Sequence, residues 1–230
     1  MCIIFAFGKI IFIKPNQKKL KGDLSKIFIE TTNQLSLRHD AREQALSISR
    51  AVIRLSANAI RAVHRSEFVE AESLIADARL KLKETETIKD DNPEIYYAGF
   101  LSDARKEFCE ANVTLAIISG KALPYPADLE VDATDYLNGI AEVIGELRRY
   151  ILDALRNDKY VDLCEQFMEI MDEIYGVLVM VDFPEAVTNG LRRSTDAMRG
   201  VLERTRGDLT MSLRQRQLEI QLKEWEDTRR

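Results

Sequence analysis

Apolar residues recur every three or four positions along most of this chain, with few glycines or prolines between them. The pattern is clearest over residues 133–155, where the apolar positions are Leu137, Ile140, Ala141, Ile144, Leu147 and Ile151. Steps of three and four place these side chains on one face of an α-helix. Between Leu24 and Arg65 there is no Gly and no Pro, which predicts one very long helix or two nearly continuous ones.

Breaks in the pattern divide the rest of the chain into further helices. The segment Lys121–Asp132 carries two prolines and is the one clear loop, while Asn157-Asp158 and Asp182–Pro184 are shorter breaks. The predicted helices cover residues 24–65, 66–87, 93–119, 134–155, 160–179 and 184–223, with Gly200 and Gly207 as candidate interruptions of the last. Long helices joined by short connections predict an all-α up-and-down bundle in one domain.

The first residues do not follow this pattern. Residues 2–13 are almost all apolar and are followed by Lys14, Lys18, Lys19 and Lys21. So short a stretch cannot span a bilayer, and the charge order is the reverse of that in a signal peptide. We expect a disordered tail or a mis-assigned start at residues 1–22, with a packed strand, an oligomer contact or membrane attachment as alternatives. The helical domain then covers residues 23–224, and residues 225–230 form a frayed C-terminal tail.

Composition narrows the functional classes. Hydrophobic residues make up 46% of the 230 residues, too many for a disordered chain, whereas 10 Gly and 5 Pro are too few for the turns of a β-sandwich or barrel. Cys2, Cys109 and Cys164 are widely spaced, which indicates reduced thiols in a cytoplasmic protein rather than a disulfide or zinc framework. No phosphate-binding loop, dinucleotide-binding motif or nucleophile motif occurs, so nucleotide-fold and covalent-nucleophile chemistries have no support.

Positive charge is concentrated in an otherwise acidic chain. The net charge is −5, yet residues 38–65 and residues 189–218 each carry a net charge of +4 in which every base is arginine. At about 100° per residue, Arg50, Arg54, Arg61 and Arg65 form one stripe along a helix, with His64 at its edge. Guanidinium groups match phosphate oxygens, so the stripe is a candidate contact for a nucleic-acid backbone. The alternative is a solvated helix face that pairs with acids of a neighbouring helix.

Acidic residues gather on two of the predicted helices. Asp103, Glu107 and Glu110 share one side of the third helix, and Glu142 and Glu146 are neighbours on the fourth at i and i+4. Two helices that each present a carboxylate pair are one way in which a bundle binds a divalent metal. Such a metal can promote displacement at phosphorus. The alternative is that these acids are simply solvated.

Three segments together resemble the translin/Trax family. They are the long first helix with Arg38–Glu43, Ser49-Arg50 and Ala62–Arg65, the segment Ala104–Ala111, and the segment Asp135–Leu147. The last is the most specific, because Asp-Tyr-Leu, two glycines six residues apart and Gly-Glu-Leu occur in fixed register. The resemblance covers residues 24–218.

The resemblance implies a translin-like bundle of about six or seven long helices that assembles into hollow octamers. It also implies, for a Trax-type subunit, a Mg²⁺-dependent site that cleaves single-stranded RNA with two Glu at i, i+3 and an acid pair at i, i+4. The matching positions are Glu107, Glu110, Glu142 and Glu146, and all four are acidic. Glu142 stands where the family usually has Asp, which puts the choice of metal in doubt. Asp103 has no counterpart and is left out of the site.

We therefore predict a Trax-like endoribonuclease that uses Mg²⁺, with Mn²⁺ as an alternative, and forms a homo-oligomer, an octamer by analogy. The four glutamates hold the metal and carry catalysis. The RNA backbone is expected to bind Arg50, Arg54, Arg61 and Arg65, together with Arg38 and Arg42. DNA is an alternative ligand, and no membrane partner is expected. The rival hypotheses are a non-catalytic translin-like shell that binds single-stranded RNA or DNA, and a purely structural helical assembly.

Overall fold

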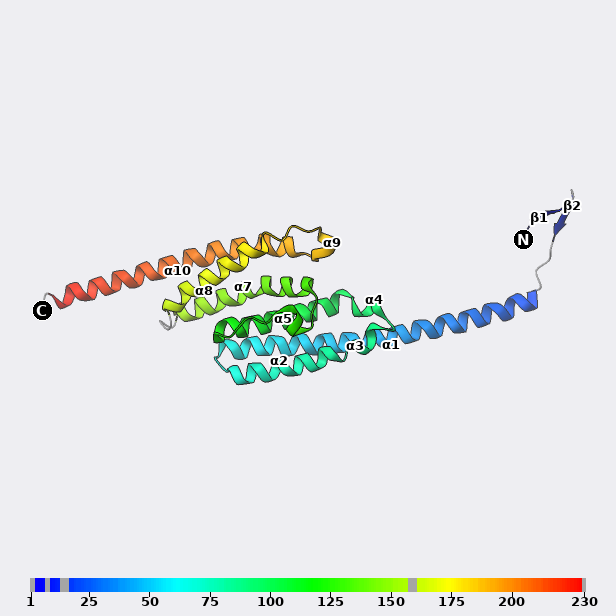
Figure 1. Ribbon diagram of the computed structural model, residues 1–230, viewed down its shortest axis with the longest axis horizontal. Coiled ribbons are helices and arrows are strands. Elements are labelled where there is room, and N and C mark those ends of the chain that lie inside the picture. The colour runs from blue at the N-terminus through cyan, green and yellow to red at the C-terminus, as the bar shows by residue number, and fades with distance from the viewer. Residues whose placement is uncertain (1–2, 7–8, 13–16, 157–160, 229–230) are drawn as a thin grey trace.

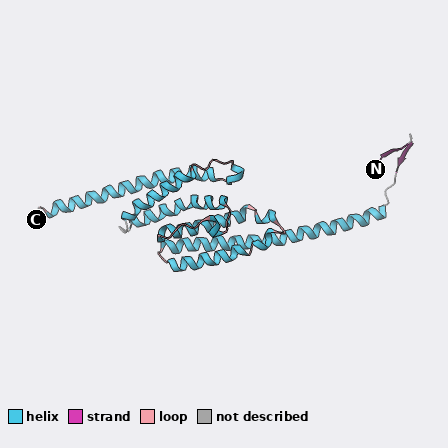
Figure 2. Cartoon of the chain, viewed as in Figure 1, coloured by secondary structure: helices cyan, strands magenta, loops and turns pink. Residues whose placement is uncertain are grey.

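The computed structural model describes residues 3–6, 9–12, 17–156 and 161–228, most of which are helical (Figure 2). Six long helices form the frame within these ranges: α1 (Gln17–His64), α2 (Phe68–Lys83), α5 (Gly99–Ser119), α7 (Ala133–Arg156), α8 (Val161–Leu178) and α10 (Leu191–Asp227). Single-turn helices lie between them: α3 (Glu86–Lys89), α4 (Pro93–Tyr96), α6 (Pro126–Leu129) and α9 (Glu185–Thr188). The predicted all-α bundle of six or seven long helices is confirmed.

The long helices pack side by side in an order that places α5 and α7 at the centre (Figure 1). Helix α1 contacts α2 and α5, α5 contacts α7, and α7 contacts α8 and α10. Two apolar cores result. One lies among α1, α2 and α5 around Val63 and Phe108, and the other lies among α7, α8 and α10 around Ile144, Met171 and Leu202. The α5–α7 pair joins the two halves of the molecule.

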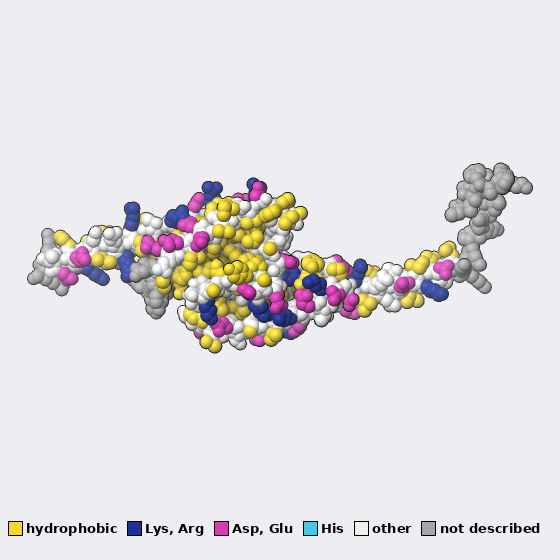
Figure 3. All heavy atoms as spheres, in the orientation of Figure 1, with side chains coloured by type: hydrophobic (Ala, Val, Ile, Leu, Met, Phe, Trp, Pro, Cys, Tyr) yellow, Lys and Arg dark blue, Asp and Glu magenta, His cyan; other side chains and the backbone are white. Residues whose placement is uncertain are grey.

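Two helices extend beyond this body as arms that point in opposite directions (Figure 1). The N-terminal part of α1 exposes Leu24, Phe28 and Leu35, and the C-terminal part of α10 exposes Leu218 and Trp225. Apolar side chains also gather over the middle of the body, on the face shown in Figure 3. Among the described helices, none combines the length and the apolar character that crossing a bilayer requires.

A small hairpin precedes α1. Strand β1 (Ile3–Ala6) pairs antiparallel with β2 (Lys9–Phe12), with Ile3 opposite Phe12 and Ala6 opposite Lys9. Helix α1 then begins at Gln17, so the boundary expected between residues 22 and 23 falls inside a helix. At the other end α10 continues to Asp227, three residues into the expected tail of residues 225–230.

Three predicted helices need correction. The helix expected over residues 66–87 ends at Lys83, and the separate turn α3 follows it. The helix expected over residues 93–119 is two helices, because Ala98 adopts an extended backbone between α4 and α5. The stretch expected from Pro184 breaks at Asn189 and Gly190, where the backbone turns left-handed (φ 47° and 92°). It is continuous through Gly200 and Gly207, since a single Gly in a long helix costs only about 1 kcal/mol. The break predicted at Asn157-Asp158 lies outside the described residues.

The central helix pair depends on one glycine. A Cβ atom added at Gly139 on α7 would lie 2.6 Å from Cβ of Cys109 and 2.8 Å from the backbone oxygen of Lys106, both on α5. Neither position could move without shifting a helix. Gly139 therefore allows α5 and α7 to approach more closely than any other residue would permit.

We expect Gly139→Ala to lower the free energy of unfolding by about 1–3 kcal/mol, because the added methyl group overpacks the α5–α7 contact. Gly207→Ala is the matched control: a Cβ atom there meets nothing within 4 Å, so the better helix propensity of Ala should raise stability by up to about 1 kcal/mol. Urea unfolding followed by circular dichroism measures both. Equal effects of the two substitutions would contradict the close approach.

Candidate functional site

The four glutamates predicted as metal ligands lie on the adjacent helices α5 and α7. Glu107 and Glu110 are three residues apart on α5, and Glu142 and Glu146 are four apart on α7. These spacings place each pair on one face of its helix. The two pairs are close enough that Glu107 and Glu110 both experience the charges of Glu142 and Glu146. The structure thus brings all four predicted acids into one cluster.

Glu110 is the most buried member of this cluster, with 8% of its surface exposed. Within the described part of the chain, its side chain makes no hydrogen bond or ion pair. Burial, followed by the charges of Glu107, Glu146 and Glu142, raises the pKa of its carboxyl to about 8. Burial also raises the pKa of Glu107. Without a cation, Glu110 therefore retains its proton near neutral pH.

The two acids of α7 have partners on other helices. Glu142, whose side chain is 48% exposed, lies with Oε1 3.5 Å from Nζ of Lys106. Glu146 accepts a hydrogen bond of 2.5 Å from Nε2 of His64, the last residue of α1. This hydrogen bond lowers the pKa of Glu146 despite its burial, and Arg149, 3.8 Å away, has the same effect. The α5 acids thus favour protonation, whereas Glu146 favours ionisation.

These partners affect how the cluster could hold a metal. Among the described residues, no three His, Cys, Asp or Glu side chains converge closely enough to bind one ion. Glu146 is engaged by His64, and Glu142 by Lys106. Carboxylate oxygens are nevertheless the ligands that Mg²⁺ prefers, and the buried carboxylate of Glu110 has no ion pair with a described residue. The chemistry of the donors is therefore that of a site for a hard divalent cation, although the described side chains do not converge on one point.

A buried polar network fixes the register of α5 against α7. Arg105, 5% exposed, lies 3.6 Å from the carboxylate of Asp135 and donates a hydrogen bond of 2.9 Å to the backbone oxygen of Tyr96. Its guanidinium group also stacks on the Tyr96 ring, 4.4 Å from the centroid. Ser102 donates a further hydrogen bond to Asp135. Because these contacts lock the start of α7 onto α5, they set where Glu142 falls relative to the α5 acids.

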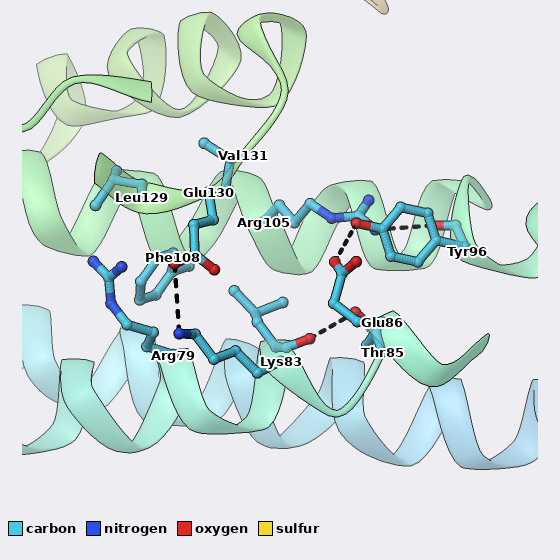
Figure 4. A pocket seen from close by; sticks show the side chains of 11 residues that line it. Arg79, Lys83, Thr85, Glu86, Tyr96, Arg105, Phe108, Leu129, Glu130 and Val131 are labelled. Carbon is cyan, nitrogen blue, oxygen red and sulfur yellow. Dashed lines mark hydrogen bonds and ion pairs between the residues drawn. The ribbon is translucent and has the colours of Figure 1, made fainter. Parts of the chain in front are cut away.

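A cavity on the outer side of this network is too small for a substrate. Lys83 and Glu130 close one end through a 3.4 Å ion pair, and Tyr96 donates a 2.7 Å hydrogen bond to Glu86 at the other end (Figure 4). Burial raises the pKa of Tyr96 to about 12. The space between these pairs is about 20 Å³, which holds roughly one water molecule. The candidate chemistry lies with the acids rather than with this small cavity.

Comparison with known proteins extends over most of the chain. No protein-family model matches it. The chain is 34% identical over 196 residues to the uncharacterised protein MJ0175 of Methanocaldococcus jannaschii. The aligned region covers 83% of this chain and 85% of that protein. The crystal structure of AfC3PO, an archaeal translin/Trax-family protein, matches with a TM-score of 0.75 and 32% identity over 82% of this chain and 98% of that one.

The chain belongs to the translin/Trax family. The structure of AfC3PO in complex with duplex RNA gives a TM-score of 0.74 at the same 32% identity, over 82% of this chain and 97% of that one. Apo-NeC3PO shares the fold, with a TM-score of 0.68 at 18% identity over 88% of this chain and all of that one. The resemblance noted in the sequence is confirmed at the level of family and fold.

Structural roles account for much of the Asp135–Leu147 motif in this translin/Trax protein. Asp135 binds Arg105 and Ser102, as described above, and the Tyr136 hydroxyl donates a 2.5 Å hydrogen bond to the backbone oxygen of Pro124. Gly139 allows the close approach of α5. Gly145 has no such role, since a Cβ atom there would meet nothing within 4 Å.

The predicted RNA-binding arginines lie on α1 except Arg65, which was expected on the same helix but follows its last residue. They fall into two groups. Four have partners: Arg38 binds Glu94 at 3.3 Å, Arg42 binds Glu43 at 3.0 Å, Arg65 binds Glu67 at 2.5 Å, and Arg61 binds Asn58 at 2.6 Å. Arg50 and Arg54 are exposed and have no ion pair or hydrogen bond with a described residue. Arg50 and Arg54 are consequently the members of the stripe best placed to bind phosphate.

Two residues of this translin/Trax site were not predicted from the sequence. His64 stood out only as the edge of the arginine stripe, and Lys106 was not singled out. Their contacts with Glu146 and Glu142 join residues on different helices, so no local spacing reports them. The only signal for His64 was its place beside the stripe, at the end of a helix that carries five arginines.

The raised pKa of Glu110 predicts how stability depends on pH in metal-free protein. Between its ordinary value of 4.5 and the folded value of about 8, the folded state binds more protons than the unfolded state. The free energy of unfolding therefore falls as pH rises through this window. Glu110→Gln, which stays neutral, should flatten that fall. Urea unfolding in EDTA from pH 5 to 9 tests this, and parallel pH profiles for wild type and variant would refute it.

Proposed function

We propose that this protein is a metal-dependent endoribonuclease that cleaves single-stranded RNA within a cytoplasmic homo-oligomer. The observation that carries the proposal is Glu110, a buried carboxylate without a partner that faces three other carboxylates. Burying such a group is costly unless a proton or a cation neutralises it. Glu142 and Glu146 have positive partners in Lys106 and His64, whereas Glu107 and Glu110 have no ion pair with a described residue, and a divalent cation would neutralise them.

Each part of the site has a role in this proposal. Glu107, Glu110, Glu142 and Glu146 would hold Mg²⁺, or Mn²⁺ in its place. The ion supplies Lewis-acid stabilisation of the charge that develops on a phosphodiester during hydrolysis. His64 fixes the carboxylate of Glu146, and Lys106 holds Glu142. No protein nucleophile is required.

The arginine stripe supports RNA as the substrate. Arg50 lies about 40° and Arg54 about 80° around the α1 axis from His64, and about 20 Å and about 15 Å along it. An RNA backbone held by these side chains would follow α1 over this distance to reach the residue that touches the acid cluster. A structure of the relative AfC3PO in complex with duplex RNA is known, which makes duplex RNA a necessary comparison with single strands in any assay. Exposed apolar residues on the arms offer surfaces for self-association, and an octamer is the expected stoichiometry.

The decisive experiment is cleavage of a labelled single-stranded RNA by purified protein, with Mg²⁺ or with EDTA. We expect cutting with Mg²⁺ and none with EDTA, and slower cutting of the same sequence as a duplex. Sedimentation velocity on the same sample reports the oligomeric state. Binding without cutting, in Mg²⁺ and in Mn²⁺, would overturn the proposed nuclease.

Reversing charge in the stripe should weaken RNA binding. We expect Arg50→Glu and Arg54→Glu each to lower affinity for single-stranded RNA and to reduce the slope of log Kd against log salt by about 1, because each removes one phosphate contact. Fluorescence anisotropy at several salt concentrations measures this. Arg214→Glu, at an exposed position on the arm of α10, is the control for net charge, and an equal change in that variant would mean that the stripe is not the binding surface.

A non-catalytic shell that binds single-stranded RNA or DNA is the second candidate. It is favoured by the observation that the acids do not converge on one point among the described residues. It requires the stripe but not the cluster, so substitutions of the acids would leave its only activity unchanged.

A further inference from the structure

A hollow of about 280 Å³ lies on the outer face of α7, where α10 packs against it. From α7 it is lined by Ala141, Glu142 and Gly145, and from α10 by Arg193, Ser194 and Met198. Its volume is close to that of small-ligand pockets in general. The hollow is therefore large enough to receive a flat group such as a nucleobase.

The lining is suited to a base with an attached phosphate. Ala141 and Gly145 are small, so a flat ring can approach the helix backbone, and Met198 offers a polarisable side chain that packs well on aromatic rings. Arg193 is exposed and has no ion pair or hydrogen bond with any residue in the described ranges. An unpaired guanidinium group at the rim of an apolar hollow is available for phosphate.

The hollow adjoins the acid cluster at Glu142. This residue lines the hollow and also belongs to the group of four carboxylates, where it contacts Lys106 of α5. Glu142 and Gly145 are three residues apart and so lie on the same face of α7. A group seated on Gly145 would be the immediate neighbour of one bound at the acids.

Gly145 itself is unexplained by the folded chain alone. It is exposed inside a 24-residue helix, where Gly costs about 1 kcal/mol relative to Ala. No neighbour requires the absence of a side chain, since nothing lies within 4 Å of an added Cβ atom. Close approach of a ligand to the backbone is a common reason for Gly in such a position.

We propose that this hollow is a nucleotide subsite, in which the base next to the cleaved phosphodiester rests on Gly145 and Arg193 binds the adjoining phosphate. The proposal rests on the proposed function, because it assigns a place to part of the same RNA. It makes Arg193 and Gly145 binding residues that lie outside the arginine stripe of α1. Sequence preference in the RNA would then depend on this hollow rather than on the stripe.

The test fills the hollow without disturbing the fold. Gly145→Leu adds a side chain where the backbone leaves open space, and Gly207→Leu is the matched control at an equally open glycine of a long helix. We expect Gly145→Leu to raise both the Kd and the KM for a labelled single-stranded RNA at least fivefold, since stacking of one base contributes about 1–3 kcal/mol. The kcat should change little, and Gly207→Leu should match wild type.

The RNA affinity of an Arg193 variant and the oligomeric state of the Gly145 variant distinguish a nucleotide subsite from other roles of the hollow. Arg193→Gln should raise the Kd and reduce the salt slope by about 1, as loss of one phosphate contact requires. If wild type binds RNA but does not cut it, the Kd values still test the subsite while the nuclease proposal fails. An unchanged Kd in Gly145→Leu would overturn the subsite. So would a change of oligomeric state in that variant by sedimentation, because the hollow would then receive a second copy of the chain.

Discussion

Glu110→Gln should reduce Mg²⁺-dependent cleavage of single-stranded RNA by more than about 100-fold, because replacing even a group that merely supports a metal ligand typically costs 10–100-fold. Gln is nearly isosteric with Glu but carries no charge, so the cluster loses the acid that is buried without a partner. RNA affinity should remain close to that of wild type, since the arginines are untouched. Cleavage rates at saturating RNA, with Mg²⁺ titrated, measure the loss.

The control for this substitution is Glu169→Gln on α8, an exposed acid outside the cluster. It should cut as wild type does. If Glu110→Gln also cuts as wild type does, the activity belongs to a contaminant or to another site. Loss of both cutting and RNA binding in Glu110→Gln would point to unfolding rather than to metal binding, which thermal melting would reveal.

The second large effect is expected at His64. Its imidazole holds the carboxylate of Glu146 through the 2.5 Å hydrogen bond, so His64→Ala should free that carboxylate and leave it half-buried without its main partner. We expect about a 10–100-fold rise in the Mg²⁺ concentration that gives half-maximal cleavage. His64→Gln, which can still donate a hydrogen bond, should recover part of this loss.

The chain offers a natural control for His64. Its other histidine, His39, is exposed on the arm of α1, and His39→Ala should leave the Mg²⁺ dependence unchanged. A merely structural role for His64 would lower the melting temperature without moving the Mg²⁺ midpoint. That result, or equal behaviour of the Ala and Gln variants, would contradict the positioning role.

The sequence predicts features that lie within a single helix, but it does not predict contacts between residues on different helices. Helical periodicity located the long helices, and spacing on single helices placed Glu107 with Glu110 and Glu142 with Glu146. The break at Ala98 and the continuity through Gly200 were missed, because packing between helices decides them and propensity does not. The contact of His64 with Glu146 joins residues 82 positions apart, and the partners of Arg38 and Arg65 depend on how α1 meets its neighbours.

The glycines illustrate the same limit. Gly139 and Gly145 look alike in the sequence, six residues apart in one motif. The structure separates them, since Gly139 faces the backbone of α5 and Gly145 faces open space. Only the arrangement of three helices tells which glycine serves packing.

The position of His64 in the chain also has a consequence for the order of folding. All four acids lie within residues 107–146, so α5 and α7 can bring them together by closing a short loop. The contact of His64 with Glu146 closes a loop of 82 residues, which costs about 0.7 kcal/mol more in chain entropy than the α5–α7 contact. We therefore expect α5 and α7 to pack against each other before α1 packs on them. At that stage the four carboxylates lie close together, and His64 does not yet offset their negative charge. Divalent cations present during refolding should therefore speed this step, and chelators should slow it.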